Sequence, residues 1–225
     1  MAAQLQTREV AHDVYRVSSG RVNCYLVREG MALTLIDSGL PKHWGGIVTA
    51  CTSLGLSLSA IETVLLTHVH TDHAGSTARL HAHNDATVRL HAGDAELTDG
   101  RTHRKNERGI LPYLWRPTAL ATLWELAAGG GLRMDAITSY TTVTDGETLD
   151  VPGRPTAIHV PGHTQGSVAF VLADRDVCFS GDALVTWNLL TGRRGPQLLA
   201  SGFMEDSRMA MKSLRASANR SADAW

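Results

Sequence analysis

The amino-acid sequence predicts an α/β protein in which two β-sheets stack face to face with helices on the outside. The first observation behind this prediction is that strand-like runs alternate with helix-like runs, and that this order occurs twice along the chain. The second is that histidine and aspartate residues directly follow several of the strand-like runs. At 225 residues, 43% of them hydrophobic, the chain is long enough to bury a substantial core.

Three short strands are expected near the N-terminus, because branched and alternating apolar residues there are punctuated by Gly20 and Gly30. A helix should follow and end before Gly55, a residue type that often stands just beyond a helix C-terminus. The expected strands are 12–18, 22–28, 31–36, 61–66 and 87–90, and the expected helices are about 42–54, 76–82 and 94–97.

The segment from about 101 to 135 has a different character and is interpreted as a helical insertion. Between Ile110 and Ala128, leucine and aromatic residues recur at roughly helical spacing. The insertion could cover a substrate, or it could be an ordinary pair of core-facing helices, and the sequence leaves both possibilities open. Strands are expected again at 138–144, 156–160, 167–172 and 176–179, followed by a last helix at about 206–216.

The strongest functional signal lies between Thr67 and Gly75, directly after the strand at 61–66. If the backbone stays extended there, His68 and His70 point to the same side, Asp72 continues the row, and His73 follows as the chain turns. Imidazole and carboxylate groups are ligands that suit zinc or iron. Because a His-x-His-x-Asp-His pattern after an apolar strand is rare, it predicts a metal site rather than a histidine-rich surface turn.

Two later strands also run into metal-capable residues. One leads into Gly162 and His163, and the other into Gly181 and Asp182. A glycine before each of these residues lets the backbone bend sharply or approach a bound ion closely. We therefore expect His163 and Asp182 to converge with the first motif on one metal-binding spot.

Together with Asp37-Ser38-Gly39, these segments resemble the metallo-β-lactamase superfamily of hydrolases, in order and over nearly the whole chain. The resemblance implies an αβ/βα four-layer sandwich of two mixed sheets with outer helices, formed as a single domain over residues 1–225. It also implies zinc as the cofactor, as one or two ions, with iron or manganese as possible substitutes. The implied ligands are His68, His70 and His163 for a first metal and Asp72 and His73 for a second, with Asp182 bridging both.

The sequence departs from the family pattern at its C-terminal end. Family members continue into a further strand with a last histidine, whereas here no histidine follows His163 and the chain stops at Trp225. The expectation is a C-terminal end that looks truncated and lacks the last strand, with a well-held first metal and a weak or empty second one. His103, in the insertion, is the best candidate for a replacement ligand or for a substrate contact.

The resemblance implies a binuclear metallo-hydrolase that uses a metal-bound hydroxide on an ester, lactone or thioester bond, or on a lactam. Asp72 would orient the nucleophile, and Asp182 would fix the distance between the metals. A dedicated β-lactamase is disfavoured because those enzymes generally lack a bridging carboxylate. A glyoxalase II-like enzyme is disfavoured by the lack of an additional C-terminal helical region, and a family lactonase by Val185, which stands where lactonases have tyrosine.

Other functional classes stay open. A mononuclear iron dioxygenase acting on a sulfur compound would need only His68, His70 and His163. A catalytically impaired metal-binding chain would follow from the absent last histidine. A nuclease of the same superfamily is disfavoured because neither an added domain nor a basic arm is visible in the sequence.

Aromatic and cationic residues are the candidates for substrate contacts. Tyr113, Trp115, Trp124 and Trp187 suggest an apolar acyl or ring group, although core packing explains such residues at least as well. Arg193 and Arg194 could receive a carboxylate or phosphate, although a solvated loop is their default interpretation.

The overall composition limits partners and location. A formal net charge of −1 argues against a broad nucleic-acid surface. The N-terminal ten residues lack the apolar core of a signal peptide, and the three cysteines are far apart, as in a reducing compartment. No apolar stretch approaches membrane-spanning length. We expect a cytoplasmic protein that acts on a small molecule, and the sequence leaves its oligomeric state open.

Overall fold

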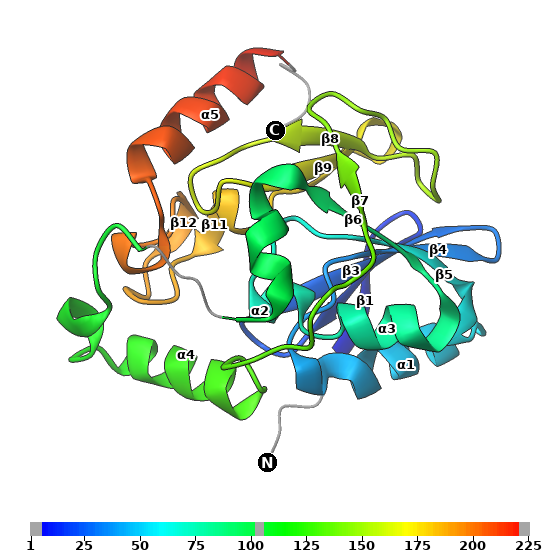
Figure 1. Ribbon diagram of the computed structural model, residues 1–225, viewed down its shortest axis with the longest axis horizontal. Coiled ribbons are helices and arrows are strands. Elements are labelled where there is room, and N and C mark those ends of the chain that lie inside the picture. The colour runs from blue at the N-terminus through cyan, green and yellow to red at the C-terminus, as the bar shows by residue number, and fades with distance from the viewer. Residues whose placement is uncertain (1–5, 102–105, 221–225) are drawn as a thin grey trace.

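The computed structural model describes residues 6–101 and 106–220, and it contains one large sheet and two smaller ones (Figure 1). The large sheet has seven strands in the order β1-β2-β3-β4-β5-β6-β7. These strands are β1 (Gln6–Ala11), β2 (Val14–Ser18), β3 (Asn23–Glu29), β4 (Ala32–Ile36), β5 (Ile61–Leu65), β6 (Thr87–His91) and β7 (Thr141–Val143). β1 to β4 pair antiparallel, whereas β4 to β7 pair parallel, so this sheet is mixed.

The second sheet has three strands in the order β10-β9-β8, and a two-stranded hairpin lies beside it. Its strands are β8 (Thr156–His159), β9 (Val168–Leu172) and β10 (Val177–Phe179), and the hairpin consists of β11 (Val185–Trp187) and β12 (Arg194–Gln197). Within the described residues this second sheet is antiparallel throughout, so only the seven-stranded sheet is mixed as predicted.

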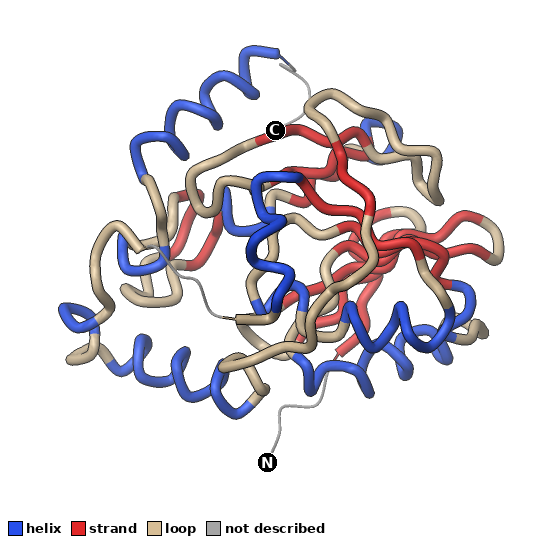
Figure 2. Tube along the Cα trace, viewed as in Figure 1, coloured by secondary structure: helices blue, strands red, loops and turns tan. Residues whose placement is uncertain are grey.

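Helices cover the outer faces of both sheets (Figure 2). The α-helices are α1 (Trp44–Ser53), α2 (Thr71–Ala74), α3 (Thr77–Asn84), α4 (Pro117–Ala128) and α5 (Ser207–Arg220). α1 and α3 connect successive parallel strands, because two parallel strands need a crossover that returns to the same end of the sheet. On the other side of the molecule, Leu214 of α5 packs against Val160 and Ala169 of the second sheet.

The alternating faces of the strands explain the layers. In β9, Phe170 points into a core between the two sheets, whereas the neighbouring Ala169 points toward α5. In the same way, Leu65 at the end of β5 faces the core between the sheets, and Val64 faces the core under α1 and α3. Helix, sheet, sheet and helix therefore follow one another, as the predicted four-layer arrangement requires.

Several elements differ from the sequence-based expectation. β1 was not predicted, and its side chains are mostly exposed, so it lacks the alternating apolar pattern that indicates a half-buried strand. The β11–β12 hairpin was also missed. The expected helical insertion is broken before Pro117 into the 3-10 helix η4 (Leu111–Tyr113) and α4, because a residue that precedes proline is disfavoured in helical conformation.

Two of the expectations fall outside the described part of the chain. His103, the proposed replacement ligand, and residues 221–225, at the expected truncated end, are not among the described residues. Across the described ranges, the structure contains no helix with the length and apolarity that crossing a lipid bilayer requires.

Candidate metal centre

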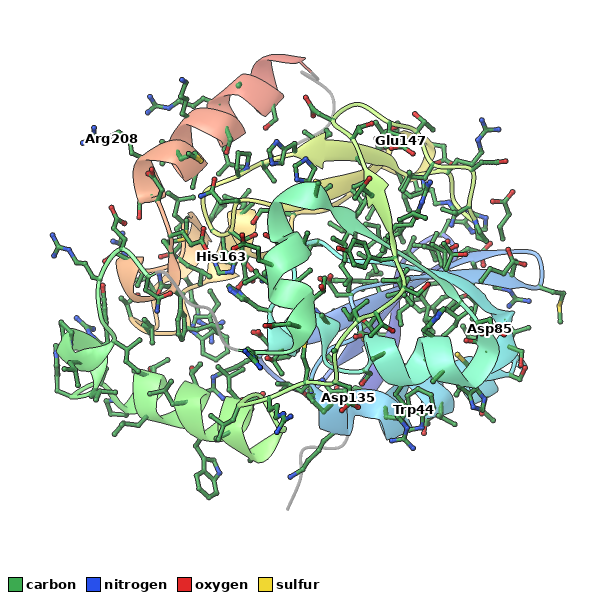
Figure 3. All side chains as sticks on the ribbon, viewed as in Figure 1. Trp44, Asp85, Asp135, Glu147, His163 and Arg208 are labelled. Carbon is green, nitrogen blue, oxygen red and sulfur yellow. The ribbon has the colours of Figure 1, made fainter. Side chains whose placement is uncertain are left out.

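Three histidines from two different loops meet at one edge of the sheets. His68 and His70 follow β5, and His163 follows β8. The Nε2 atom of His163 lies 3.1 Å from Nε2 of His68 and 3.0 Å from Nδ1 of His70. His163 is labelled in Figure 3, near the middle of the molecule. The geometry therefore brings together the three histidines that the sequence proposes for a first metal.

The residues expected to bind a second metal, Asp72 and His73, lie in a different backbone conformation from the predicted one. The extended row ends at His70, whose φ and ψ are −99° and 155°, and α2 begins at the next residue. The expectation that Asp72 continues the extended row is therefore wrong, because a helical turn presents both Asp72 and His73. His68, His73 and Asp182 form a second group whose potential ligand atoms lie within 4.8 Å of one another.

Asp72 stands beside this second group rather than in it. Its Oδ2 lies 3.8 Å from Nε2 of His73, and its side chain lines the same cavity as His70, His163 and Asp182.

Asp182 lies between His73 and His163. Its Oδ1 is 3.5 Å from Nε2 of His73, and its Oδ2 is 3.5 Å from Nε2 of His163. Burial by itself raises the pKa of Asp182, but the neighbouring His73 and His163 outweigh it and hold the pKa far below its ordinary value. One carboxylate oxygen thus faces His73 and the other faces His163, which is the placement that a bridging ligand needs.

Asp37 supports this arrangement from beneath, a role that sequence reasoning did not assign. Its Oδ1 accepts a hydrogen bond from the backbone N–H of Thr67 at 2.8 Å, and its Oδ2 lies 2.8 Å from Nδ1 of His73. Burial lowers the pKa of His73, but the carboxylates of Asp37 and Asp182 more than offset it and raise that pKa well above its ordinary value. The available signal was the polar Asp-Ser-Gly sequence at the end of a buried strand.

Asp94 is a second buried carboxylate that sequence reasoning missed. It lies in the 3-10 helix η3 (Ala92–Asp99) and is only 1% exposed. Burial raises its pKa, and hydrogen-bond donors from Val69, Thr164 and Gly166 partly counter this effect. The sequence carried no visible signal for this role, because an acidic residue at the start of a short helix is ordinary.

Two cavities open at the candidate centre. The first has a volume of about 10 Å³, room for about one water molecule. It is lined by His70, Asp72, His163 and Asp182 together with Asn106 and the apolar side chains of Leu126, Leu189 and Phe203. The second is a cleft of about 640 Å³, and Asp72, His73 and Asp182 line it as well. The charged groups therefore stand between an apolar pocket and a larger cleft.

The residues proposed for substrate contact separate into two sets. Trp187 and Arg194 line the large cleft, and the guanidinium of Arg194 lies 5.7 Å from the ring centre of Trp187. Tyr113, Trp115 and Arg193 line neither of the two cavities. The hydroxyl of Tyr113 lies 3.1 Å from Oγ of Ser201, and Trp115 is 73% exposed.

The donor set fits a divalent transition-metal ion. A zinc ion bound at 2.0–2.1 Å by tetrahedral imidazoles would hold their nitrogens about 3.3 Å apart. His163 lies 3.1 Å from His68 and 3.0 Å from His70, close to that separation. In addition, Asp37 beside Nδ1 of His73 is the carboxylate partner that orients metal-binding histidines in many proteins.

Comparison with known proteins places this geometry in a family context. A model of the metallo-beta-lactamase superfamily matches residues 18–224. The uncharacterized protein YobT of Bacillus subtilis is 34% identical over 163 residues, which cover 72% of this chain and 61% of that protein. The human acyl-coenzyme A thioesterase MBLAC2 is 26% identical over 189 residues, which cover 77% of this chain and 62% of that protein. The chain thus spans about three fifths of the length of these two relatives.

Solved structures agree on the fold. BJP-1, a subclass B3 metallo-beta-lactamase of Bradyrhizobium japonicum, superposes with a TM-score of 0.66 at 19% identity, covering 98% of this chain and 74% of that one. A B3 metallo-beta-lactamase described as having an active-site glutamic acid superposes with a TM-score of 0.65 at 25% identity, covering 98% of this chain and 76% of that one. Because the family model spans nearly the whole chain and these structures share its fold, this protein belongs to the metallo-beta-lactamase superfamily.

Proposed function

We propose that this protein is a zinc-dependent hydrolase of the binuclear type that cleaves a thioester or ester bond next to an apolar acyl group. The observation that carries the proposal is the position of Asp182, whose two carboxylate oxygens each lie 3.5 Å from a different histidine, His73 and His163. A carboxylate placed in this way can bridge two ions, and two neighbouring ions suit hydrolysis of a carbonyl compound.

The proposed ligands come from the two groups and from Asp72 beside them, and His68, which belongs to both groups, is assigned to the first ion. His68, His70 and His163 would hold one ion, while His73, Asp182 and the adjacent Asp72 would hold the other. An ion bound there supplies Lewis acidity and lowers the pKa of a coordinated water to about 7, so that a nucleophile is available at neutral pH. The mixture of imidazole and carboxylate donors favours zinc, and the same donors would also accept iron or manganese.

The chain's own residues supply orientation and exclusion of water. Burial and two nearby carboxylates fix the ring of His73. Asp72 lines the small cavity with an acceptor group, in a position to orient a water molecule toward the carbonyl carbon. Leu126, Leu189 and Phe203 form the apolar wall of the same cavity, whose volume of about 10 Å³ is the room of about one water molecule. They would therefore bound the reacting end of the acyl group and keep bulk water out.

The choice of a thioester draws on the relatives as well as on the pocket. Proteins similar to this chain include acyl-coenzyme A thioesterase MBLAC2 and an atrochrysone carboxyl ACP thioesterase of Aspergillus fumigatus. The thiol portion of such a substrate, on the far side of the scissile bond from the acyl group, would lie in the large cleft. There Trp187 offers an aromatic face and Arg194 a positive charge. We therefore keep Trp187 and Arg194 as proposed substrate contacts.

The proposal also covers the domain organisation, the cellular compartment and the class of substrate. Strands from both sheets share the core between them, which supports one domain. Cys24, Cys51 and Cys178 are free thiols, which supports a reducing compartment such as the cytoplasm. The substrate would be a small molecule rather than a nucleic acid, because the net charge of −1 gives no broad basic surface.

The test is a hydrolysis panel with the full chain loaded with zinc. Acyl-coenzyme A thioesters, p-nitrophenyl esters, homoserine lactones and a cephalosporin would be compared, before and after chelation. We expect thioester or ester turnover that chelation abolishes and added zinc restores. The variant His68→Ala should lose this turnover, whereas His81→Ala, a histidine on α3 outside both groups, should keep it.

Other outcomes of the panel would reject the proposal. Turnover of the cephalosporin alone would indicate a β-lactamase. Oxygen consumption by the iron-loaded chain with a sulfur substrate would favour the dioxygenase alternative, for which His68, His70 and His163 suffice. Zinc binding without turnover on any compound would indicate a catalytically impaired chain.

A further inference from the structure

Asp94 lies between the two loops that carry the three histidines of the first group. Its Oδ2 accepts a hydrogen bond from the backbone N–H of Val69 at 2.9 Å and another from Oγ1 of Thr164 at 3.0 Å. Its Oδ1 accepts a third from the backbone N–H of Gly166 at 2.7 Å. Val69 stands between His68 and His70, and Thr164 directly follows His163. One side chain thus joins both histidine-bearing loops.

The backbone around Asp94 is packed too closely for larger residues. A Cβ atom on Gly166 would lie 2.5 Å from Cγ of Asp94, and a Cβ atom on Gly93 would lie 2.6 Å from the carbonyl oxygen of Gln165. Both distances are shorter than real Cβ contacts, so glycine is needed at both positions. The loop after β6 is therefore fitted directly against the loop after β8.

From this arrangement we propose that Asp94 is a positioning residue, which clamps the His68/His70 loop to the His163 loop and so sets the separation of the three imidazoles. This inference rests on the proposed function, because it assigns Asp94 a role toward the metal that the three histidines would hold. Asp94 acts through the loops, and its carboxylate oxygens are occupied by donors from Val69, Thr164 and Gly166.

A carboxylate is required because all three groups donate to it and two of them, the backbone N–H groups of Val69 and Gly166, cannot accept. Two oxygens that accept without donating can satisfy all three groups. An asparagine at position 94 would offer one oxygen, and its NH₂ group would face the N–H of Gly166 or the donors from Val69 and Thr164. At least one buried donor would lose its acceptor, and a buried donor without an acceptor is unfavourable. The two loops would then separate on the side where the bond is lost, and the imidazoles would move apart.

The competing explanation is that Asp94 only stabilises the fold, as any buried and fully bonded carboxylate does. The two explanations differ in what they predict for metal affinity at a given loss of stability. Thr34 offers a matched control, because it is buried in β4 and its Oγ1 donates a buried hydrogen bond to the carbonyl of Pro152 at 2.9 Å. Thr34→Val removes that bond and keeps the side-chain shape.

The experiment compares Asp94→Asn with Thr34→Val in the full chain. The readouts are the Zn²⁺ dissociation constant from competition with a chromophoric chelator, the visible spectrum of the Co²⁺ form, and the melting temperature of the metal-free protein. We expect Asp94→Asn to weaken zinc binding about 10–100-fold, as loss of outer-shell partners does, and to change the Co²⁺ spectrum. Thr34→Val should lower the melting temperature while zinc affinity and spectrum stay as in the parent protein.

Several results would overturn the inference. Unchanged zinc affinity and Co²⁺ spectrum in Asp94→Asn would do so, as would an equal loss of affinity in Thr34→Val. If Asp94→Asn does not fold, Thr164→Val removes one of the three bonds and keeps the carboxylate. That variant should show a smaller loss of affinity in the same direction, and unchanged affinity would again reject the clamp.

These readouts are independent of the substrate. A chain that hydrolyses no compound in the panel but loses zinc affinity in Asp94→Asn would keep the clamp and reject the proposed function. In an active enzyme, we expect kcat to fall more than KM rises, because the clamp affects the geometry of the ligands and not the walls of the substrate cavity.

Discussion

The imidazole of His73 is held between two carboxylates, with Nδ1 at 2.8 Å from Oδ2 of Asp37 and Nε2 at 3.5 Å from Oδ1 of Asp182. An ionised carboxylate can only accept, so Nδ1 of His73 carries a proton and donates to Asp37. Nε2 is then directed toward Asp182 and the second group of potential ligands. Asp37 therefore determines which nitrogen of His73 is available to an ion.

Replacing Asp37 by asparagine should weaken zinc binding by the second group of ligands. The amide would accept from Thr67 or from His73 but could not serve both as the carboxylate does. We expect the affinity for a second zinc ion to fall about 10–100-fold. Zinc stoichiometry and competition titrations would measure this change. Asp85→Asn is the control, because Asp85 ends α3 in the left-handed region that asparagine tolerates, well away from His163 (Figure 3). Equal effects of the two substitutions would contradict the prediction.

The stability of the metal-free protein should depend on pH through His43. The Nδ1 atom of His43 accepts a hydrogen bond from the backbone N–H of Leu40, and its Nε2 lies 2.8 Å from Oγ of Ser19. Burial lowers the pKa of His43 in the folded state, although the more distant Glu125 and Asp72 act in the opposite direction. The unfolded state therefore binds more protons between the lowered pKa and the unperturbed pKa of about 6.5. Stability from this residue is complete above about pH 6.5 and is lost as the pH falls through that window.

His43→Gln removes this titration, so its free energy of unfolding should fall less steeply on acidification than that of the parent protein. Urea unfolding of both metal-free proteins at several values between about pH 5 and pH 8 would measure the difference in slope. Parallel curves for the two proteins would show that His43 makes no contribution.

Gly181→Ala should displace Asp182. Gly181 has a φ of +51°, and an added Cβ would lie 2.5 Å from Oγ1 of Thr67. Gly30 is a matched control, because its φ of +59° is similar and no atom lies within 4 Å of an added Cβ. Both alanine variants should lose roughly 1–2 kcal/mol of stability from the left-handed backbone conformation. Only Gly181→Ala should also lose zinc affinity and turnover, and retention of both would show that Asp182 tolerates the shift.

The sequence predicted the parts of the centre that rest on local patterns. His68 and His70 follow a buried strand and stand two positions apart, so in extended backbone they point to the same side. His163 and Asp182 each follow a glycine at the end of a strand. The position of Asp72 was predicted wrongly, because the start of α2 at Thr71 depends on packing that no local pattern shows. Asp37 and Asp94 were missed as supporting residues, since their bonds join residues 30 and 72 positions apart, as in Asp37–Thr67 and Asp94–Gly166.

The dependence on non-local packing also explains why Tyr113 and Trp115 line neither cavity of the candidate site. Tyr113 and Trp115 were candidate substrate contacts because of their type, and type alone does not give direction. Trp115, which precedes the break at Pro117, is 73% exposed, whereas Leu126 on the following helix lines the small cavity. A helix face can be predicted from spacing, but which face meets the site depends on the loop that precedes it.

The apolar wall of the small cavity should select the acyl group. Leu126 on α4 lines this cavity beside His70 and His163, whereas Trp124 on the same helix is 76% exposed. The cavity has room for about one water molecule, so Leu126→Ala should open space for a longer acyl chain and the preferred acyl length should increase. Since one methylene in an apolar pocket is worth about 1–3 kcal/mol, kcat/KM for a longer acyl chain relative to the shortest one should rise at least about 10-fold. Trp124→Ala should leave the chain-length profile unchanged. Measuring kcat/KM over a series of acyl-coenzyme A thioesters tests this, and an unchanged profile in Leu126→Ala would show that the acyl group lies elsewhere.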